Sequence, residues 1–280
     1  MLSWTARREP LITRGIIERV AMNWMKSFVE RILKNKVFWC CVLCVTALSF
    51  TAVCYANESG KEYSFWDLFF EGQMRQIFLE NDITFESLIT NPISIFMAMF
   101  MPILVIFPFL NVFWNEKMTN NYLFRQARIG VRKYIVGSMA EAVLSSGLLA
   151  VLGRFLYEGI LFVIFTSMGK MPILSQIVPL LLRKGIRFFF YGCLVCIPVL
   201  FFTALLKNRY IILCMPFILI YLYDLLLRNR NIAIWETTGI LYYPWKQYLV
   251  TAGVWMAAAA LVLMIGCYCL IKRRLLRGTW

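Results

Sequence analysis

The chain has 280 residues, of which 61% are hydrophobic and 16% are charged, and its formal net charge at pH 7 is +14. Soluble domains are nearer half apolar and a quarter charged, so the composition excludes an ordinary soluble protein and predicts an all-α, polytopic membrane protein. Histidine is absent, which excludes His-based catalytic triads and HExxH zinc sites. We attribute the excess of Lys and Arg to the cytoplasmic flanks of membrane spans and not to nucleic-acid binding, because no basic, aromatic module stands outside the apolar segments.

Residues 1–36 precede the first apolar segment and are predicted to form a cytoplasmic, amphipathic N-terminal segment. Apolar residues recur at spacings of three and four from Ile16 to Leu33, and charged residues fill the opposite face. That pattern is typical of a helix lying in the membrane interface, and a helix docked on another protein domain is the alternative. The first apolar core begins near Val37, which is too late for a cleavable signal peptide.

Six apolar segments have roughly the 20 residues that a helix needs to cross about 30 Å of hydrocarbon. We therefore predict a six-span transmembrane domain over residues 37–271, followed by a basic cytoplasmic tail at 272–280. The predicted spans are Val37–Ala56, Ile93–Trp114, Tyr134–Leu156, Phe188–Leu206, Ile211–Leu227 and Tyr248–Ile271.

Three connections are expected on the outer side of the membrane, at residues 57–92, 157–187 and 228–247. The first holds seven acids against two bases and an aromatic stretch with helical periodicity, which predicts a small cap on the outer surface. The second is apolar over residues 157–182 but is interrupted around Lys170. We expect this stretch to be interfacial or re-entrant, with a further pair of short spans as the alternative.

The distribution of Lys and Arg predicts the orientation of the spans. Nineteen of these residues lie in the N-terminal segment, in the 115–133 and 207–210 connections and in the C-terminal tail, whereas the three outer connections hold nine. Because cytoplasmic loops carry the excess of Lys and Arg, we expect a multi-pass protein of the plasma membrane with both termini in the cytoplasm.

Nine cysteines lie within apolar stretches, where Cys is typically a small, soft, apolar side chain. We expect neither a disulfide nor a metal site, because no histidine and no paired hydrophilic loops accompany them. The signatures GxxxxGK[ST] and GxGxxG are also absent from the sequence, so we expect no nucleotide site in this chain.

The connection at residues 115–133 is unusually basic, with five bases and one acid. Arg125, Arg128 and Arg132 recur at spacings of three and four, which places them on a common stripe if the segment is helical. Guanidinium groups suit the carboxylates of a protein partner or the phosphates of lipid. The residues alone leave open both a docking element and a loop that only contacts anionic lipid.

Glu116, followed by the pattern R-x-x-R-x-G-x-R-K-Y-I-x-G over residues 125–137, resembles the cytoplasmic connection in permease subunits of type-2 ABC exporters. The wider chain is similar as well, with an amphipathic N-terminal segment, six spans, a polar first outer loop and a basic tail. Two positions depart from the family pattern. Asn120-Asn121 stands where a step such as Gly-Thr is usual, and Ser138 stands where Lys is usual.

The resemblance implies that segment 115–133 is a coupling helix, seated in a groove on a separate nucleotide-binding ATPase subunit. The ATPase-coupling residues would be Glu116, Arg125, Arg128 and Arg132. ATP and Mg²⁺ would bind to that partner, and this permease would work together with a second copy or with a homologous permease. The connection at residues 231–247 would contain short re-entrant helices.

Ionisable residues within the predicted spans are functional candidates, because charge is costly in lipid. The candidates are Glu141, Arg154, Glu158 and Asp224. Arg154 and Glu158 are four residues apart, so we expect them to pair on one helix face near the outer end. For Glu141, a role on the substrate path and an interhelical hydrogen bond both stay open.

We therefore predict the membrane permease subunit of an ATP-driven exporter, which moves its substrate by alternating access. The acidic first outer loop favours a cationic peptide or antibiotic as that substrate. A secondary transporter or channel without an ATPase partner is the alternative. A membrane enzyme acting on lipid is a further one, although the lack of histidine and of a carboxylate cluster within a span weighs against most such chemistries.

Overall fold

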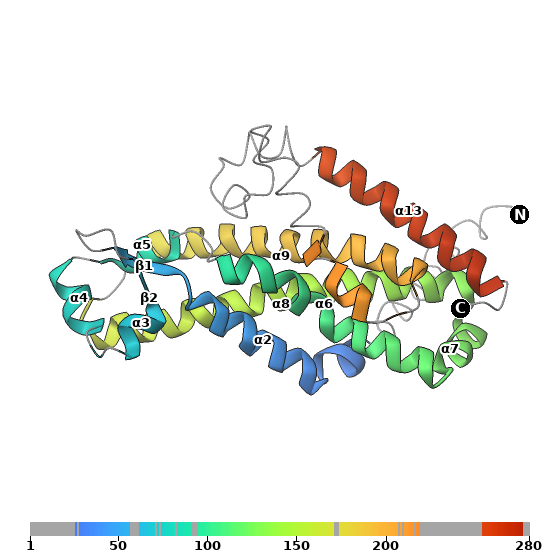
Figure 1. Ribbon diagram of the computed structural model, residues 1–280, viewed down its shortest axis with the longest axis horizontal. Helices are drawn as coiled ribbons and strands as arrows, with labels where there is room; N and C mark the ends of the chain where they lie inside the picture. Colours follow the sequence, from blue (N-terminus) through green and yellow to red (C-terminus); the bar gives the residue numbers. More distant parts are fainter. Residues whose placement is uncertain are drawn as a thin grey trace, which may run out of the picture.

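Long helices run side by side along the molecule and give it an elongated shape (Figure 1). The structure is a computed structural model, and it describes residues 26, 28–56, 62–70, 72, 74–81, 83–90, 95–170, 174–206, 208, 210–215, 217–218 and 254–276. The main helices are α2 (Lys36–Ser49), α6 (Ile95–Met118), α8 (Val131–Ser167), α9 (Leu174–Leu205) and α13 (Val254–Leu276). α8 and α9 form a central hairpin, against which α2, α6 and α13 pack.

Within the part of the chain that the structure describes, three helices are long and apolar enough to cross a membrane. The stretches that could span the membrane are Met99–Met118, Val131–Ser167 and Ile177–Thr203. They correspond to the second, third and fourth predicted spans. The protein is therefore a helical, membrane-embedded protein, as its composition predicts. The fifth predicted span lies largely outside the described residues, and the sixth overlaps α13.

The first predicted span, Val37–Ala56, is only partly helical. α2 ends at Ser49, and its 14 residues cover about 21 Å, which is less than the thickness of the hydrocarbon layer. The last four residues of the predicted span instead form strand β1 (Val53–Ala56), which pairs antiparallel with β2 (Glu62–Ser64). The rings of Tyr55 and Tyr63 stack 6.1 Å apart, and such cross-strand pairs stabilise a hairpin. The otherwise helical fold thus contains a small sheet.

The acidic connection at residues 57–92 forms a small cap at the end of the α8–α9 hairpin (Figure 1). Its described residues form β2, which pairs with β1, and the helices α3 (Phe65–Phe70), α4 (Met74–Glu80) and α5 (Phe85–Thr90). An apolar cluster of its own joins the cap to the hairpin, and its buried members are Phe50, Phe65, Leu68, Phe78, Ile83, Phe85, Leu88, Ile89, Tyr157, Leu161, Phe165 and Ile177. Aromatic rings dominate this cluster, as in the stacked pair Phe78 and Phe165 at 5.6 Å. Large buried aromatic surfaces of this kind fix the cap in place.

α8 and α9 are longer than the spans predicted for them, and they include most of residues 157–182, the segment expected to be interfacial or re-entrant. α8 continues without a break to Ser167, and α9 begins at Leu174. With 37 residues, α8 is about 55 Å long, which is nearly twice the thickness of the hydrocarbon layer. The two helices therefore reach beyond the apolar band to carry the cap.

Burial explains why α8 does not end where the sequence suggested. Tyr157, Leu161 and Phe165 are almost fully buried, and their spacing of four residues keeps them on the helix face that meets the cap. The sequence predicts that Arg154 and Glu158 lie near the outer end of the third span. Both side chains are buried inside the protein, so they do not interrupt the helix.

Small residues allow α8 to approach its neighbours closely. A Cβ at Gly192 of α9 would lie 2.5 Å from the carbonyl oxygen of Ser146, and a Cβ at Gly153 would lie 2.6 Å from the side chain of Val45 in α2. Where α2 crosses α8, the Thr46 hydroxyl donates to the Gly153 carbonyl at 2.9 Å. Glycine at helix crossings and hydroxyl hydrogen bonds between helices are typical of packing within membranes.

Only the end of the predicted amphipathic N-terminal helix lies within the described residues. Residues Val29–Leu33 form a short π-helix, η1, next to α2 and α6. Its Ile32 is fully buried in the main core and its Glu30 is exposed. This end of the segment is thus amphipathic, and its apolar side packs on the helix bundle of the same chain.

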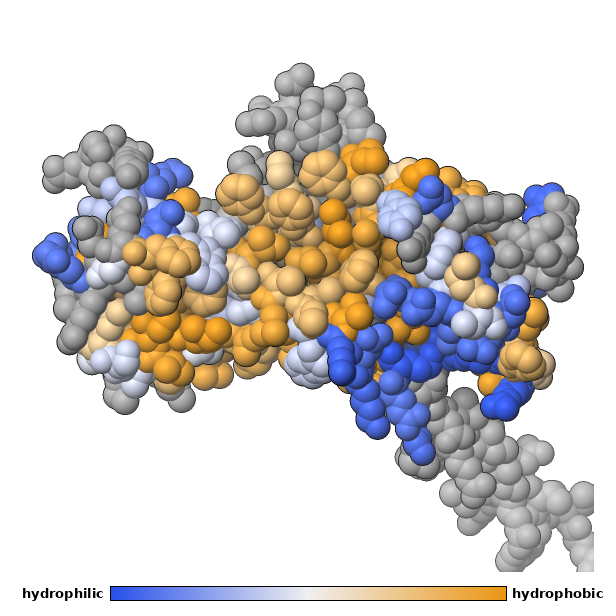
Figure 2. Space-filling model, turned by 60° about the horizontal axis from the view of Figure 1, so that its bottom comes forward, coloured by the Kyte–Doolittle hydropathy of each residue, from blue (hydrophilic) through white to orange (hydrophobic). Residues whose placement is uncertain are grey.

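An apolar surface covers the middle of the molecule, and hydrophilic residues gather towards its ends (Figure 2). One end carries α7 (Asn121–Ile129) and the C-terminal end of α13 (Figure 1). The exposed basic residues of these segments and of the start of α2 and α8 are Lys34, Lys36, Arg128, Arg132, Lys133, Lys272 and Arg273. We refer to this end as the basic end, and the cap lies at the opposite end.

Candidate functional site

α7 is a nine-residue helix that connects α6 to α8 at the basic end (Figure 1). Asn120, just before it, has φ 56°, a left-handed conformation that Asn adopts more readily than most residues. Gly130, just after it, has φ 82°, which favours glycine. These two residues turn the chain at either end of α7. None of the residues of α7 is buried, so the helix lies on the outside of the bundle.

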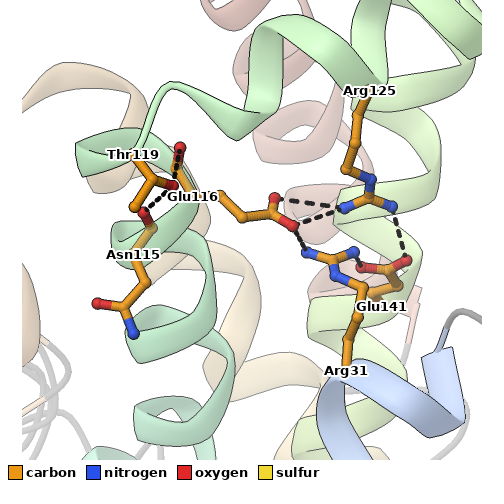
Figure 3. A network of polar contacts seen from close by, with 6 residues as sticks. All are labelled: Arg31, Asn115, Glu116, Thr119, Arg125 and Glu141. Atoms are coloured by element: carbon orange, nitrogen blue, oxygen red, sulfur yellow. Dashed lines mark hydrogen bonds and ion pairs between the residues drawn. The ribbon is translucent and has the colours of Figure 1, made fainter.

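Four charged side chains from four segments meet beside α7 (Figure 3). They are Arg31 of η1, Glu116 of α6, Arg125 of α7 and Glu141 of α8. Arg31 Nη2 lies 2.5 Å from Glu116 Oε1, and Arg31 Nη1 donates to Glu141 Oε2. Arg125 Nη1 donates to both Glu116 oxygens at 3.1 and 3.3 Å, and its Nη2 donates to Glu141 Oε1 at 3.4 Å. Each carboxylate is therefore shared by two guanidinium groups, and we call this set the four-residue network.

The four-residue network is largely withdrawn from solvent. The Glu141 side chain is 0% exposed and that of Glu116 is 14% exposed, compared with 18% for Arg31 and 25% for Arg125. The two positive and two negative charges balance, so the network buries no net charge. The buried Tyr134 ring also lies 5.6 Å from the Arg125 guanidinium, which adds a cation–π contact. Removing one member would leave a poorly compensated charge inside the protein.

The structure separates the residues that the sequence grouped as ATPase-coupling. Glu116 and Arg125 belong to the four-residue network and face the bundle, whereas Arg128 and Arg132 are exposed. The predicted single stripe of Arg125, Arg128 and Arg132 on one helix is not present, because Gly130 ends α7 and Arg132 belongs to α8. Within this set, Arg128 is the outward-facing cation of α7.

Arg31 is the member of the four-residue network that sequence reasoning missed. It lies on the polar face of the amphipathic N-terminal segment, where basic residues ordinarily face water or lipid headgroups. Its partner Glu141 is 110 residues away in the chain, so no local spacing indicates the pair. The signal that could have found it is the cost of a lone carboxylate within a span, since Glu141 requires a cationic partner from some other segment.

The outward surface of α7 combines apolar and basic side chains. Leu123 is 51% exposed, Phe124 69% and Ile129 43%, and Met118 at the end of α6 is 72% exposed. Arg128 is exposed among them. Exposed apolar side chains and a cation thus share the outside of this short helix.

A second buried ion pair lies at the other end of α8. Arg154 Nε donates to Glu158 Oε1 at 3.0 Å, and the two side chains are only 5% and 2% exposed, so the structure contains the i, i+4 pair expected from the sequence. Arg154 Nη2 also donates to the Ile89 carbonyl of α5 at 3.3 Å. The guanidinium lies 4.7 Å from the Tyr157 ring and 5.5 Å from the Phe188 ring. The pair thus helps to hold α5 on α8 and α9.

Asp224 lies outside the described residues. All nine cysteines are free, and within the described ranges no three potential metal ligands come together. Cys267 is buried, and its thiol donates to the Leu200 carbonyl at 3.4 Å, so it acts in helix packing. Burial raises the pKa of the Cys54 thiol in β1 to about 12, which keeps that thiol protonated and unreactive at neutral pH.

No protein-family model, curated protein or solved structure matches the chain.

Proposed function

We propose that this chain is the membrane permease subunit of an ATP-driven exporter, and that α7 is the helix through which a separate ATPase subunit acts on it. The observation that carries the proposal is the position of α7. It stands outside the bundle with no buried residue, yet Arg125 ties it by charged hydrogen bonds to both α6 and α8. An element with that placement suits the transfer of motion from a soluble partner into the helices.

The four-residue network supplies the route for that motion. A displacement of α7 moves Arg125, and Arg125 is bonded to Glu116 at the end of α6 and to Glu141 within α8. Arg31 binds the same two carboxylates, so η1 follows as well. Charge-assisted hydrogen bonds are about twice as strong as neutral ones, so we expect the four segments to move together. Alternating access would then follow from the movement of α6 and α8.

The partner would recognise the outward surface of α7 by apolar and ionic contacts. Phe124 and Leu123 offer exposed apolar area, and Arg128 offers a guanidinium group. The complementary groove on an ATPase subunit would be apolar with a carboxylate at its edge. ATP and Mg²⁺ would bind to that subunit, because this chain has no nucleotide-binding signature.

The basic end supports a cytoplasmic position for α7. The exposed Lys and Arg residues of four segments are gathered there, and cytoplasmic flanks of membrane spans carry such an excess. In the proposed arrangement the chain has six spans in the plasma membrane, with both termini inside and the cap outside. A second copy or a homologous permease completes the transporter, and the acidic residues of the cap favour a cationic peptide or antibiotic as substrate.

The proposal is tested by purifying the tagged chain from its own cells in a mild detergent and measuring which protein accompanies it. We expect a P-loop ATPase that hydrolyses ATP in the complex. The double variant Phe124→Ala with Arg128→Glu should bind this subunit with an affinity at least about a hundredfold lower than that of the wild type. One lost charge-assisted hydrogen bond contributes about 1.5–3 kcal/mol, the aromatic contact adds a further term, and 1.4 kcal/mol is about tenfold.

The matched control is Leu43→Ala with Lys34→Glu. It removes one exposed apolar side chain and reverses one exposed charge, but neither residue lies on α7. When the control and the α7 variant are present in the membrane in equal amounts, the control should retain the ATPase. The proposal fails if no ATPase accompanies the wild-type chain, or if the α7 variant retains it as fully as the control does. If no ATPase accompanies the wild-type chain, a transporter or channel without an ATPase partner is the better assignment.

A further inference from the structure

A pocket opens between the outer parts of α8 and α9, next to α5. Its volume is about 420 Å³, which is within the usual range for small-molecule sites. The wall is apolar except for one carboxylate, and it consists of Phe85, Phe155, Glu158, Gly159, Phe162, Ile177, Val178, Leu181 and Leu182. A Cβ at Gly159 would meet no atom within 4 Å, so the pocket is open at that position.

One of the two carboxylate oxygens of Glu158 has no hydrogen-bond donor among the described residues. Glu158 is 2% exposed, and its Oε1 accepts the hydrogen bond from Arg154. Its Oε2 is buried and has no hydrogen-bond partner within the described part of the chain. A buried charged acceptor without a donor is unfavourable. A donor brought by a ligand in the pocket would satisfy it.

The surrounding charges decide which kind of donor fits. Arg154 already neutralises Glu158, and Lys184 is close by, where it donates to the same Ile89 carbonyl as Arg154. A cationic ligand would therefore face a carboxylate whose charge is already balanced, with a second cation close behind it. An anionic ligand would contact the Glu158 carboxylate directly, because Arg154 and Lys184 do not line the pocket and its other side chains are apolar. A neutral hydroxyl group on an apolar chain avoids both penalties.

We propose that this pocket binds a neutral amphiphile, with its hydroxyl group donating to Glu158 Oε2 and its apolar chain lying along Phe155, Phe162 and Leu181. The position of the pocket relative to the membrane agrees with such a ligand, if the basic end is cytoplasmic as proposed above. About 20 residues of α8 cross the hydrocarbon layer, so a helix that enters at Tyr134, where the predicted span begins, leaves it close to residue 154. Glu158 then lies about 6 Å further along the helix, in the headgroup layer, where the hydroxyl groups of amphiphiles reside.

The test uses a photoreactive hexadecanol that carries a diazirine on its chain. The full-length purified chain, in phosphatidylcholine nanodiscs, is irradiated with this probe, and the labelled residues are mapped by mass spectrometry. We expect labelling within residues 155–182, suppressed by excess unlabelled hexadecanol. The same probe as its methyl ether, which cannot donate a hydrogen bond, should label at least about tenfold less.

A variant that fills the pocket gives an independent readout. Gly159→Leu places a side chain in the open space and leaves Arg154 and Glu158 unchanged, so it should reduce labelling of residues 155–182 at least about tenfold. Val136→Leu adds bulk to an exposed position at the other end of α8 and should label like the wild type. Equal labelling by the alcohol and the ether, or full labelling of Gly159→Leu, overturns the proposal. The assay contains no ATPase, so its failure and the failure of the exporter proposal are separate results.

Discussion

At the scale of single residues, Glu141 shows how a charge can be kept within a membrane helix. A carboxylate in a span is costly unless it is paired, and Glu141 is completely buried. Arg31 and Arg125 both bind it, and each of them also binds Glu116. The charge of Glu141 is thus compensated by residues from two other segments, which explains why the sequence tolerates it.

The coupling between Arg31 and Glu141 is measurable in a double-mutant cycle. Glu141→Gln should destabilise the protein by about 3–5 kcal/mol, because it leaves two inward-facing guanidinium groups with one carboxylate. Arg31→Gln combined with Glu141→Gln should be less destabilising than the two single changes added together, with a coupling of about 0.5–3 kcal/mol. Thermal unfolding in detergent of the wild type, the two single variants and the double variant gives the four stabilities that the cycle needs. Simple additivity would show that the two side chains do not interact.

At the scale of the elements, the two turns around α7 fix its direction. Gly130 has φ 82° and ψ 149°, a backbone conformation that is nearly restricted to glycine. This residue lets α8 begin directly after α7 ends, while Arg125 keeps its side chain against α6 and α8. The orientation of α7 therefore depends on one backbone conformation and one side chain.

Replacing Gly130 tests this dependence. Gly130→Ala should destabilise the protein by about 1–3 kcal/mol, because the Cβ opposes the native φ and ψ. The matched change Gly159→Ala lies in the middle of α8 with open space around it, and it should stabilise the protein by up to about 1 kcal/mol through helix propensity. Thermal unfolding of both variants in detergent shows whether the two changes in stability have opposite signs. If Gly130→Ala is as stable as Gly159→Ala, the turn after α7 is not strained and other contacts set its direction.

At the scale of the whole molecule, charge and apolar surface are separated along the long axis. The basic end and the acidic cap lie at opposite ends of the α8–α9 hairpin, with the apolar band between them (Figure 1, Figure 2). Such a molecule suits a membrane whose inner side faces the basic end. The proposed exporter requires this orientation, since ATP is available only to a partner on the cytoplasmic side.

Thiol labelling of intact cells checks the orientation. In a background without the nine native cysteines, Glu62→Cys in the cap should react with a membrane-impermeant maleimide. Arg132→Cys at the basic end should react only after the cells are permeabilised. Both positions are exposed in the structure, so a lack of reaction reports the membrane barrier and not burial. The reverse pattern would place α7 outside the cell and would exclude an intracellular ATPase as its partner.

Several features of the fold and of the candidate site were predictable because they depend on nearby residues. The pairing of Arg154 with Glu158 follows from a spacing of four on one helix. The break after α7 could have been predicted from Gly130, but the three arginines were assigned to one continuous helix. The third predicted span ends at Leu156, whereas α8 continues to Ser167. The sequence did not show that Tyr157, Leu161 and Phe165 are buried against the cap.

The sequence by itself determined that this is a helical membrane protein, that one of its connections is basic and that its acidic connection is rich in aromatic residues. These are matters of composition and short-range periodicity, which act through the transfer of side chains between water and lipid. Only the tertiary structure decided that Arg31 and Arg125 meet Glu116 and Glu141. It also decided that Glu158, whose Oε2 has no hydrogen-bond partner among the described residues, lies beside a pocket. Those contacts join segments up to 110 residues apart, and their partners are set by how the helices pack and not by spacing along the chain.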